Sequence, residues 1–443
     1  MGSGNGRKKK SVGKKDDKTP TQLRNARKRR MAKSAKQSAR LASSASSSAS
    51  GGDDPSLQYL SNPTVAPIIH QATSFFRERG HGFEVKVGPT SGWRTVSKLA
   101  VRSQAGVLCI GLFAPGSHQL LEIPKCLAHH PRINSAIQVI QKQCRKCAIK
   151  PYDEKTGTGS LKYVAMNIER STGNQQVSLV WNKNNSGEDE EESKLHKLCE
   201  ALIKVSKNND DRLVLHSLWV HFSNLNKYAN SIFDRDGQWD LKYGDSKMVV
   251  EYLSIEGAPK VPLHFPPQVF RQANIDAFAK IVEEIRKYLQ KNKPKKCLEL
   301  YGGVGTIGLH IADLCETFVS SDENPFNKTC FEHSVAAIQS KMTMKKIPYE
   351  SKNAVDMTYT QAFSESDTII VDPPRKGLDT EVANALCTQD KLKTLIYVSC
   401  GFAAFTRDFE VLTSKGNWKL QHAEGHVLFP GSDAIETLAF FSR

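Results

Sequence analysis

Cys400 and Glu436 are the two side chains whose types and positions raise the question of covalent chemistry. Cys400 follows the strand-like run LIYVS at residues 395–399, and a cysteine exposed at the start of a following helix would favour the thiolate, its nucleophilic form. Glu436 opens the apolar run ETLAFF, where a carboxylate is costly unless it is used or exposed at an edge. A free cysteine more often packs as a small hydrophobe, so the position of Cys400 in the fold has to decide between packing and a nucleophilic role.

A glycine-rich turn suggests a nucleotide cofactor in the same part of the chain. The run LELYGGVGTIGL at residues 298–309 places three glycines after an apolar stretch. Missing side chains there let a nucleotide approach the backbone and the N-terminus of a following helix. Such a turn can bind a dinucleotide or S-adenosylmethionine, or it can have no ligand at all. The full dinucleotide spacing is absent and Glu299 and Tyr301 precede the glycines, which favours S-adenosylmethionine.

Two acidic residues after later apolar runs fit the same cofactor. Asp322 can accept hydrogen bonds from the ribose hydroxyls of an adenosine cofactor, although on its own it could equally be a surface carboxylate. Asp372 precedes Pro373 and Pro374, which cannot continue a strand. Similar Asp-Pro-Pro turns occur in adenine amino-group methyltransferases, where an aromatic residue usually follows. Arg375 stands there instead, and its guanidinium suits a phosphate or carbonyl oxygen.

The elements that position these residues are predicted from a repeated rhythm of strand, loop and helix. Alternation of this kind predicts a doubly wound, Rossmann-like parallel sheet, in which ligands bind outside the carboxyl ends of the strands. Asp372 and Cys400 would then lie at one edge, beside the glycine turn. The apolar runs expected as strands are 296–301, 317–321, 368–372 and 394–399.

We expect three segments along the chain. Residues 1–54 are basic and end in a Ser/Gly/Ala linker, so they read as a disordered tail. Residues 55–262 mix short alternating runs with helical stretches, which indicates an α+β accessory domain. Residues 263–443 form the doubly wound domain.

Charge and composition point to nucleic acid as a partner. The 443-residue chain carries a net charge of +16, and residues 1–50 hold 15 lysines and arginines against two aspartates. A basic tail attracts phosphate backbones. Alternatively, it serves only as a two-part nuclear localisation signal, formed by RKKK at 7–10 and RKRR at 27–30. We therefore expect the nucleus or the cytoplasm. Ten cysteines without a secretory signal read as reduced thiols, and no apolar run reaches the roughly 18 residues of a membrane span, so we expect a soluble protein without membrane contact.

A possible zinc set lies further upstream. Cys126, His129, Cys144 and Cys147 have a Cys-x2-His and Cys-x2-Cys spacing that suits zinc. The second pair lies on a helical pattern of ordinary core character, so we expect no metal site while leaving this set open.

Five motifs in order resemble the RNA uracil-C5 methyltransferase family, whose members make 5-methyluridine in tRNA and rRNA. The likeness is strong over residues 264–443 and fainter upstream, through IPKCLAHHPRIN. The motifs are FRQAN at 270–274, LELYGGVGTIGL at 298–309, DPPRKGLD at 372–379, YVSCGF at 397–402 and AIETLAFF at 434–441.

The resemblance implies roles for individual positions. Cys400 would be the nucleophile that adds to uracil C6, and Glu436 the base that removes the C5 proton. S-adenosylmethionine would be the cofactor and RNA the partner, tRNA and its T-loop uridine above all, with no obligate protein partner evident. The residues that would bind the cofactor are Gln272, Tyr301, Gly303, Thr306, Asp322 and Asp372.

Some features depart from the family, and other functions remain open. The cysteine spacing does not reproduce the iron–sulfur cluster of several members, no oligonucleotide-binding barrel is evident, and Gly401 replaces the usual asparagine. An rRNA uridine is the alternative target. Cytosine-C5 methylation also uses a cysteine, but usually after proline or threonine rather than Ser399. A catalytically silent RNA-binding protein would gain nothing from keeping both Cys400 and Glu436.

Overall fold

The computed structural model describes residues 1, 54, 57–185, 189–208, 210–225, 231–244, 247–338 and 347–443. Asp53–Arg443 pack as one compact unit. The basic tail predicted at residues 1–54 lies outside the described residues apart from Met1 and Asp54, so its disorder and its function stay predictions. No helix in the described part of the chain has the length and apolar character to cross a membrane.

An eight-stranded sheet forms the C-terminal part of this unit, as the repeated apolar runs predicted. Its order is β1-β16-β17-β15-β14-β11-β12-β13. β17 runs antiparallel to both of its neighbours and every other pair is parallel. The strands are β1 (Glu84–Val87), β11 (Lys296–Leu300), β12 (Thr317–Ser321), β13 (Tyr349–Glu350), β14 (Thr368–Val371), β15 (Thr394–Ser399), β16 (Lys419–Val427) and β17 (Glu436–Ser442).

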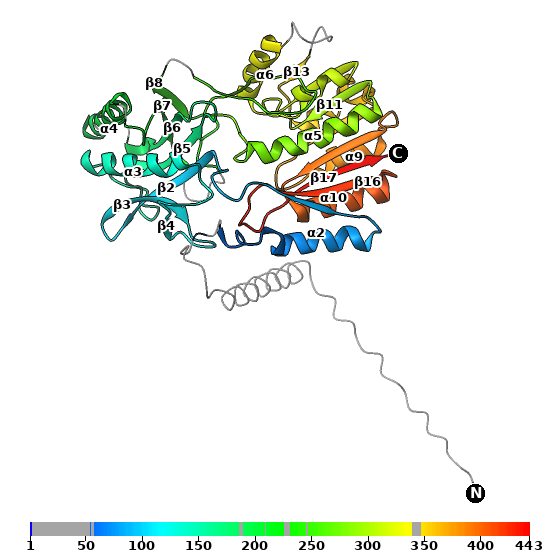
Figure 1. Cartoon of the computed structure of the whole chain (residues 1–443), viewed down its shortest axis with the longest axis horizontal. Helices are drawn as coiled ribbons and strands as arrows, with labels where there is room; N and C mark the ends of the chain where they lie inside the picture. The colour runs from blue at the N-terminus through cyan, green and yellow to red at the C-terminus, as the bar shows by residue number, and fades with distance from the viewer. Residues whose placement is uncertain are drawn as a thin grey trace. The chain divides into compact units, whose positions relative to one another are not determined.

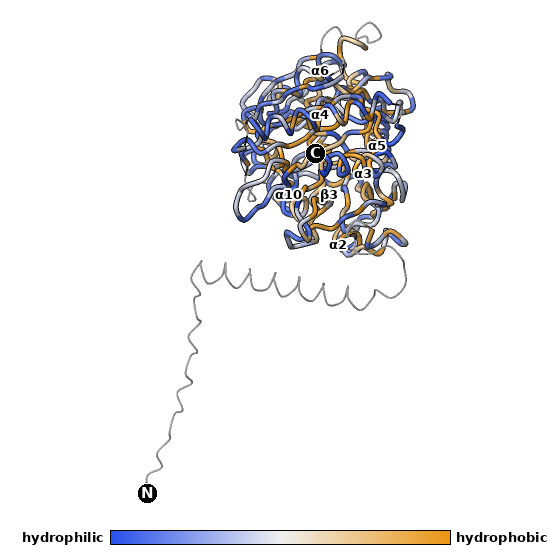
Figure 2. The backbone as a smooth tube through the Cα atoms, turned by 90° about the vertical axis from the view of Figure 1, so that its left-hand side faces the viewer, coloured by the Kyte–Doolittle hydropathy of each residue, from blue (hydrophilic) through white to orange (hydrophobic). Residues whose placement is uncertain are grey.

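Helices cover both faces of this sheet, which is why its central strands are apolar on both sides. One apolar cluster joins the sheet to α5 (Ile275–Asn292) and α6 (Pro325–Ile338). A second cluster covers the opposite face, and Figure 2 shows how such hydrophobic segments gather inside the folded part of the chain. Its helices are α2 (Pro67–Glu78), α7 (Ala354–Met357), α8 (Gln361–Glu365), α9 (Thr380–Thr388) and α10 (Phe402–Lys415).

A mixed seven-stranded sheet forms the other part, with α3 (Pro131–Lys146) and α4 (Asp189–Lys207) on one side of it (Figure 1). The strand order is β4-β3-β2-β5-β6-β7-β8. Its strands are β2 (Val96–Gln104), β3 (Val107–Phe113), β4 (Leu120–Glu122), β5 (Leu161–Ile168), β6 (Gln175–Asn182), β7 (Leu215–Ser223) and β8 (Gln238–Tyr243), while β9 (Val249–Glu251) and β10 (Leu263–Phe265) form a separate antiparallel pair.

The predicted division at residue 262 stays a prediction, and the structure adds one qualification to it. β1 and α2 precede that position in sequence, yet both pack on the eight-stranded sheet. β1 pairs with β16 in parallel, with Glu84 opposite Glu424 and Val87 opposite Val427. The segment expected as an accessory domain therefore also completes the edge of the C-terminal sheet.

Candidate active site at the carboxyl edge of the eight-stranded sheet

The central strands end together and bring Asp372, Cys400 and Glu436 to one edge. Leu300 at the end of β11 pairs with Val371 at the end of β14, and Val371 pairs with Tyr397 of β15. β17 is antiparallel, so it begins where β15 ends, and Ser399 lies opposite Thr437. Cys400 directly follows Ser399 and Glu436 directly precedes Thr437, and the charge of Glu436 acts on the Cys400 thiol.

The glycine turn after β11 is held against Asp322 at the end of β12. The Gly303 N–H donates to Asp322 Oδ2 at 3.2 Å, and Tyr301 and Gly303 both have positive φ, at 60° and 56°. A Cβ added at Gly303 would meet no atom within 4 Å, whereas one at Gly302 would lie 2.2 Å from Ser320 Oγ. The turn therefore leaves open space at Gly303 while packing tightly against the sheet at Gly302.

The helix expected directly after the glycine turn is not present. Two short 3-10 turns, Gly308–His310 and Ala312–Leu314, follow instead. The reason lies in Glu299, which is 2% exposed and accepts hydrogen bonds from the Gly308 N–H at 2.9 Å and Ser320 Oγ at 2.6 Å. These bonds tie the segment back to the sheet, so the prediction of a helix N-terminus facing the cofactor is wrong.

Tyr349 is a residue near the site that the sequence did not reveal. Its hydroxyl donates to the Gly303 carbonyl oxygen at 2.8 Å, so Tyr349 holds the carbonyl group of the residue whose N–H donates to Asp322. Tyr349 belongs to a two-residue strand with no motif around it. Only the sheet order, which places β13 beside β12, brings it to the glycine turn.

Acidic groups crowd this edge and change one another's ionisation. Burial and the nearby Asp322 charge raise the pKa of Asp372 to about 7. Burial, with Asp372 and Asp322, raises the pKa of Glu299 to about 8. Carboxyl groups held in this way are stabilised by a bound cation. The edge is therefore suited to a positively charged ligand.

Cys400 is half-buried and lies just before α10, where Gly401 is the N-cap. Burial raises the pKa of its thiol to about 11, with further contributions from Glu436 and Asp372, while Arg375 acts in the opposite direction. The sequence-based expectation of a favoured thiolate is therefore wrong for the free protein. Burial and two carboxyl groups outweigh the helix N-terminus and one arginine.

Glu436 is 6% exposed. Burial and Asp372 raise its pKa to about 8, and the positive charge of Arg375 lowers it. A carboxyl group that titrates near neutral pH can both accept and release a proton under ordinary conditions. The costly placement of Glu436 at the start of an apolar strand therefore produces a group with the properties of a general base.

The DPPR turn packs directly against the Cys400 turn. A Cβ added at Gly401 would lie 2.5 Å from the Arg375 carbonyl oxygen, so the two backbones approach as closely as glycine permits. Buried Asp408 fixes the far end of the loop by accepting from the Leu378 N–H at 2.8 Å and the Tyr397 hydroxyl at 2.7 Å. The glycine at 401 is thus a packing requirement of this chain.

The FRQAN loop is anchored on both sides of Gln272. Arg271, 3% exposed, donates to the Ile168 carbonyl oxygen at 2.8 Å and pairs with Glu251 at 2.6 Å. Asn274 caps α5 and donates to the Leu428 carbonyl oxygen at 2.8 Å. These contacts join the seven-stranded sheet to β16 through one loop and hold the half-buried Gln272 between them.

Not every predicted cofactor residue is in contact with the acidic edge. Gly303 and Asp322 are hydrogen-bonded, and Asp322 and Asp372 interact through their charges. Among the residues that the structure describes, Gln272, Tyr301 and Thr306 form no hydrogen bond with either aspartate. Tyr301 packs against the cluster under α9 and α10, and the Thr306 carbonyl oxygen accepts a hydrogen bond from His310.

The upstream cysteine and histidine pairs do not form a metal centre within the described ranges, which contain no group of three or more potential ligands. His129 hydrogen-bonds through Nδ1 to Asn134 at 3.1 Å, and Cys144 is buried in α3. Cys144 and Cys147 of the second pair pack in or against the apolar cluster under the seven-stranded sheet.

The residues at the edge fit S-adenosylmethionine. Gly303 leaves open space beside the turn, the Asp322 carboxylate is of the type that accepts from ribose hydroxyls, and the clustered carboxyl groups suit cationic sulfonium and ammonium groups. A Rossmann-like sheet whose last strand in the sequence, β17, inserts antiparallel between β15 and β16, with this site at its carboxyl edge, defines an S-adenosylmethionine-dependent methyltransferase.

Comparisons with known proteins narrow this class to one family. A family model described as tRNA (Uracil-5-)-methyltransferase matches residues 237–437. An uncharacterized RNA methyltransferase of Protochlamydia amoebophila is 35% identical over 380 residues, covering 86% of this chain and 89% of that protein. One of Enterococcus faecalis is 25% identical and covers 81% and 74%. The chain belongs to the RNA uracil-C5 methyltransferase family, with RNA as its substrate and S-adenosylmethionine as its methyl donor.

A solved structure shares the fold. The crystal structure of the Pyrococcus abyssi tRNA (uracil-54, C5)-methyltransferase in complex with S-adenosyl-L-homocysteine has a TM-score of 0.61 with this chain and 19% sequence identity. The match covers 84% of this chain and 83% of that one. The predicted fold class and the family resemblance are therefore both confirmed.

Proposed function

We propose that this enzyme methylates C5 of the T-loop uridine in tRNA through a covalent bond between Cys400 Sγ and uracil C6. The proposal is supported by the register of β15 and β17, which pairs Ser399 with Thr437, the chain neighbours of Cys400 and Glu436, and by the effect of the Glu436 charge on the Cys400 thiol. Support for tRNA comes from the description of the matching family and from the named activity of the Pyrococcus protein.

Cys400 provides the nucleophile that the reaction needs. Uracil C5 attacks a methyl donor poorly, so Sγ adds to C6, the thiol proton leaves toward the uracil O4 side, and C5 becomes enol-like. The bound S-adenosylmethionine supplies the methyl group to C5. Arg375, whose charge acts on both Cys400 and Glu436, is positioned to stabilise negative charge on the thiolate or on the ring oxygen.

Glu436 completes the reaction as the base. Its carboxylate removes the C5 proton, the electron pair re-forms the C5–C6 double bond, and the Cys400 sulfur leaves C6 and regains a proton. Because its pKa is about 8, this proton can be passed on to solvent before the next turnover. Gln272, Tyr301, Gly303, Thr306, Asp322 and Asp372 are proposed to hold the cofactor.

Two variants test the assignment with tRNA transcripts and labelled cofactor. Cys400→Ala should lose methyl transfer by on the order of a thousandfold or more, while the matched Cys387→Ala should stay active. Glu436→Gln should accumulate a protein–RNA adduct that survives denaturant, because the C5 proton is no longer removed. Methyl transfer by Cys400→Ala, or methylated RNA without any adduct in Glu436→Gln, would refute the respective role.

The target is tested separately by mapping 5-methyluridine. Total RNA from cells with and without the protein should differ at the T-loop uridine of tRNA. A difference confined to rRNA would overturn the tRNA assignment and would leave the chemistry at Cys400 untouched.

A further inference from the structure

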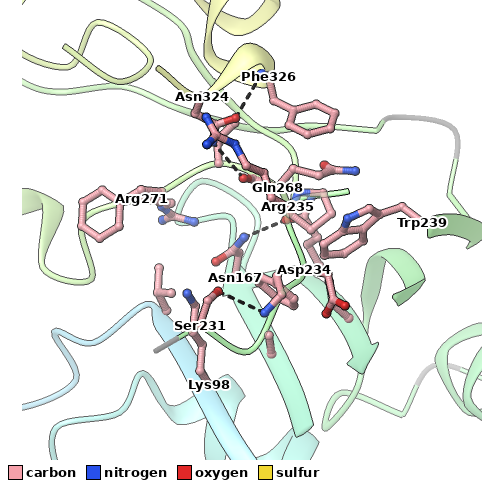
Figure 3. A pocket seen from close by; sticks show the side chains of 18 of the residues that line it. Lys98, Asn167, Ser231, Asp234, Arg235, Trp239, Gln268, Arg271, Asn324 and Phe326 are labelled. Atoms are coloured by element: carbon pink, nitrogen blue, oxygen red, sulfur yellow. Dashed lines mark hydrogen bonds between the residues drawn. The ribbon is translucent and has the colours of Figure 1, made fainter. Parts of the chain in front are cut away.

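A cavity lies outside the residues of the proposed active site, between the seven-stranded sheet and the loops that face it. Its volume is about 440 Å³. Its floor is built from β2, β5 and β6, one wall from Ser231–Arg235 and Trp239, and the other from 267–271 and 323–326 (Figure 3). None of the eight residues proposed for catalysis or cofactor binding lines it, so it forms a site of its own.

Trp239 is the aromatic residue that distinguishes this cavity. The chain has five tryptophans, and the other four are buried in the core, whereas Trp239 is half-exposed and lines the cavity. Its ring packs against Phe233, whose centroid is 4.9 Å away, and against His221 at 4.4 Å. A rigidly held indole that keeps an open surface is suited to stacking on a nucleic-acid base.

Lys98 supplies a positive charge on the same cavity (Figure 3). Its ammonium lies 5.2 Å from the centroid of the Phe233 ring, and no carboxylate of the described residues forms an ion pair with it. Lys98 is exposed on β2, so a phosphate group in the cavity can pair with its ammonium. Asp234 also lines the cavity, but Ser223 Oγ and the Asn224 N–H already occupy its carboxylate, at 2.5 and 3.0 Å.

The far wall connects the cavity to the methyltransferase half. Arg235 donates to the Glu323 carbonyl oxygen at 3.2 Å, and Asn324 donates to the Gln268 carbonyl oxygen at 3.2 Å. Glu323 and Asn324 directly follow Asp322, the proposed ribose ligand. An RNA strand that has one nucleotide in this cavity would therefore run alongside the cofactor site.

We propose that the cavity binds one unpaired nucleotide of the RNA substrate, with its base stacked on Trp239 and its phosphate at Lys98. This nucleotide is distinct from the uridine that reacts at Cys400, and the inference rests on the proposed function only for the identity of the RNA. The site selects RNA that can release a second base from its helix. Substrate choice then depends on loop shape as well as on the target uridine.

Intrinsic fluorescence provides a direct test, because Trp239 is the half-exposed tryptophan and stacking quenches indole emission. A single-stranded RNA oligonucleotide should quench the emission of the full-length protein, and the same sequence as a duplex should quench it much less. Trp239→Leu should abolish the quenching and raise the Kd for RNA roughly tenfold. Tyr359→Ala, at an exposed aromatic residue outside the cavity, is the matched control and should bind normally.

Lys98→Gln keeps the test valid if Trp239→Leu fails to fold. It should flatten the slope of log Kd against log salt by about 0.7, the loss of one phosphate contact, whereas exposed Lys391→Gln should leave the slope unchanged. Equal RNA affinity for both cavity variants and the wild type would overturn the proposal. S-adenosylhomocysteine that quenches Trp239 and blocks quenching by RNA would also overturn it, because the cavity would then belong to the cofactor.

The outcomes separate this inference from the proposed function. Normal RNA binding by the cavity variants, with methylation abolished in Cys400→Ala, would refute the nucleotide site alone. Weakened RNA binding by the cavity variants, with no methylation of the tRNA T-loop by the wild type, would refute the proposed target alone.

Discussion

After burial, the negative charge of Glu436 is the main reason that the pKa of the Cys400 thiol is raised. Their chain neighbours Thr437 and Ser399 are directly paired in the sheet, so the two groups are coupled through the antiparallel register. Burial keeps the proposed nucleophile protonated, and the charge of the proposed base adds to this effect above about pH 8, where Glu436 is ionised; a protonated thiol limits the side reactions of a free thiolate.

Glu436→Gln should lower the pKa of Cys400 because the variant removes a negative charge. Iodoacetamide should alkylate Cys400 several-fold faster in the variant above pH 8, where the wild-type carboxyl group is ionised. Alkylation is measured on the Cys400 peptide by mass spectrometry. Arg375→Gln is the control with the opposite change of charge: it removes a positive charge near the thiol and should slow alkylation. Equal rates in all three proteins would show that these charges do not reach the thiol.

Glu436 should also make stability depend on pH. Its folded pKa is about 8, above the ordinary 4.5, so the folded protein retains a proton that the unfolded chain releases. The stability from this group is therefore complete below about pH 4.5 and is lost as pH rises through 8. Glu436→Gln should raise Tm by several degrees at pH 9 relative to the wild type and by much less at pH 5.

Thermal melts at both pH values check this prediction. Glu410→Gln, at a surface ion pair with Arg79, provides the control and should show no such pH-dependent difference. A constant difference between Glu436→Gln and the wild type would mean that the carboxyl group is not held protonated.

Asp372 should make cofactor binding depend on pH. Its pKa of about 7 means that it is largely protonated at pH 6, whereas a cationic sulfonium is bound best by the carboxylate. The Kd of S-adenosylmethionine should therefore be several-fold higher at pH 6 than at pH 8. The Kd of S-adenosylhomocysteine, whose sulfur is uncharged, should change less. Asp372→Asn should remove the dependence and weaken binding roughly tenfold.

Isothermal titration calorimetry at the two pH values provides these constants, with Asp390→Asn as an exposed control. A pH dependence that persists in Asp372→Asn would assign the titration to another carboxyl group, such as Glu299.

Gly401→Ala should lower kcat although it only adds a methyl group. The new Cβ would lie 2.5 Å from the Arg375 carbonyl oxygen, so the Cys400 and Arg375 turns must separate. We expect a loss of at least tenfold in kcat, since misplacing catalytic groups by about 1 Å can cost a hundredfold. Gly82→Ala, where a Cβ meets nothing within 4 Å, should be neutral. Steady-state kinetics on RNA distinguish the two, and equal kcat values would contradict the packing argument.

Deletion of residues 2–50 tests the basic tail, which we propose binds RNA or directs the protein to the nucleus. If the tail contacts phosphates, the deletion should weaken RNA binding and flatten its salt dependence, as a salt titration of Kd would reveal. If the deletion leaves the salt dependence of Kd unchanged and a fluorescent fusion of the shortened protein no longer enters the nucleus, the tail serves only as a targeting signal.

The local pattern of apolar residues was sufficient to predict the central strands of the C-terminal sheet. β11, β12, β14 and β15 lie within the apolar runs expected from the sequence, because parallel strands covered on both faces must be apolar along their whole length. The rule that ligands bind at the carboxyl edge of such a sheet also predicts that Asp372 and Cys400 lie at the same edge.

The pairing of distant segments could not be read locally. Nothing in residues 84–87 indicates that β1 joins β16, and the two-residue β13 has no pattern that predicts the Tyr349 contact with Gly303. Such contacts depend on register and sheet order, which are set by packing across the whole fold.

Residue types in a fixed order were enough to predict the family and the cofactor class and to suggest Cys400 and Glu436 as the candidate reactive residues. Only the tertiary structure decided how the groups ionise and what surrounds them. Burial and three-dimensional charge placement raise the pKa of Cys400 where its helix position alone predicted the opposite. The cavity at Lys98 and Trp239 likewise exists only because loops far apart in the sequence enclose it.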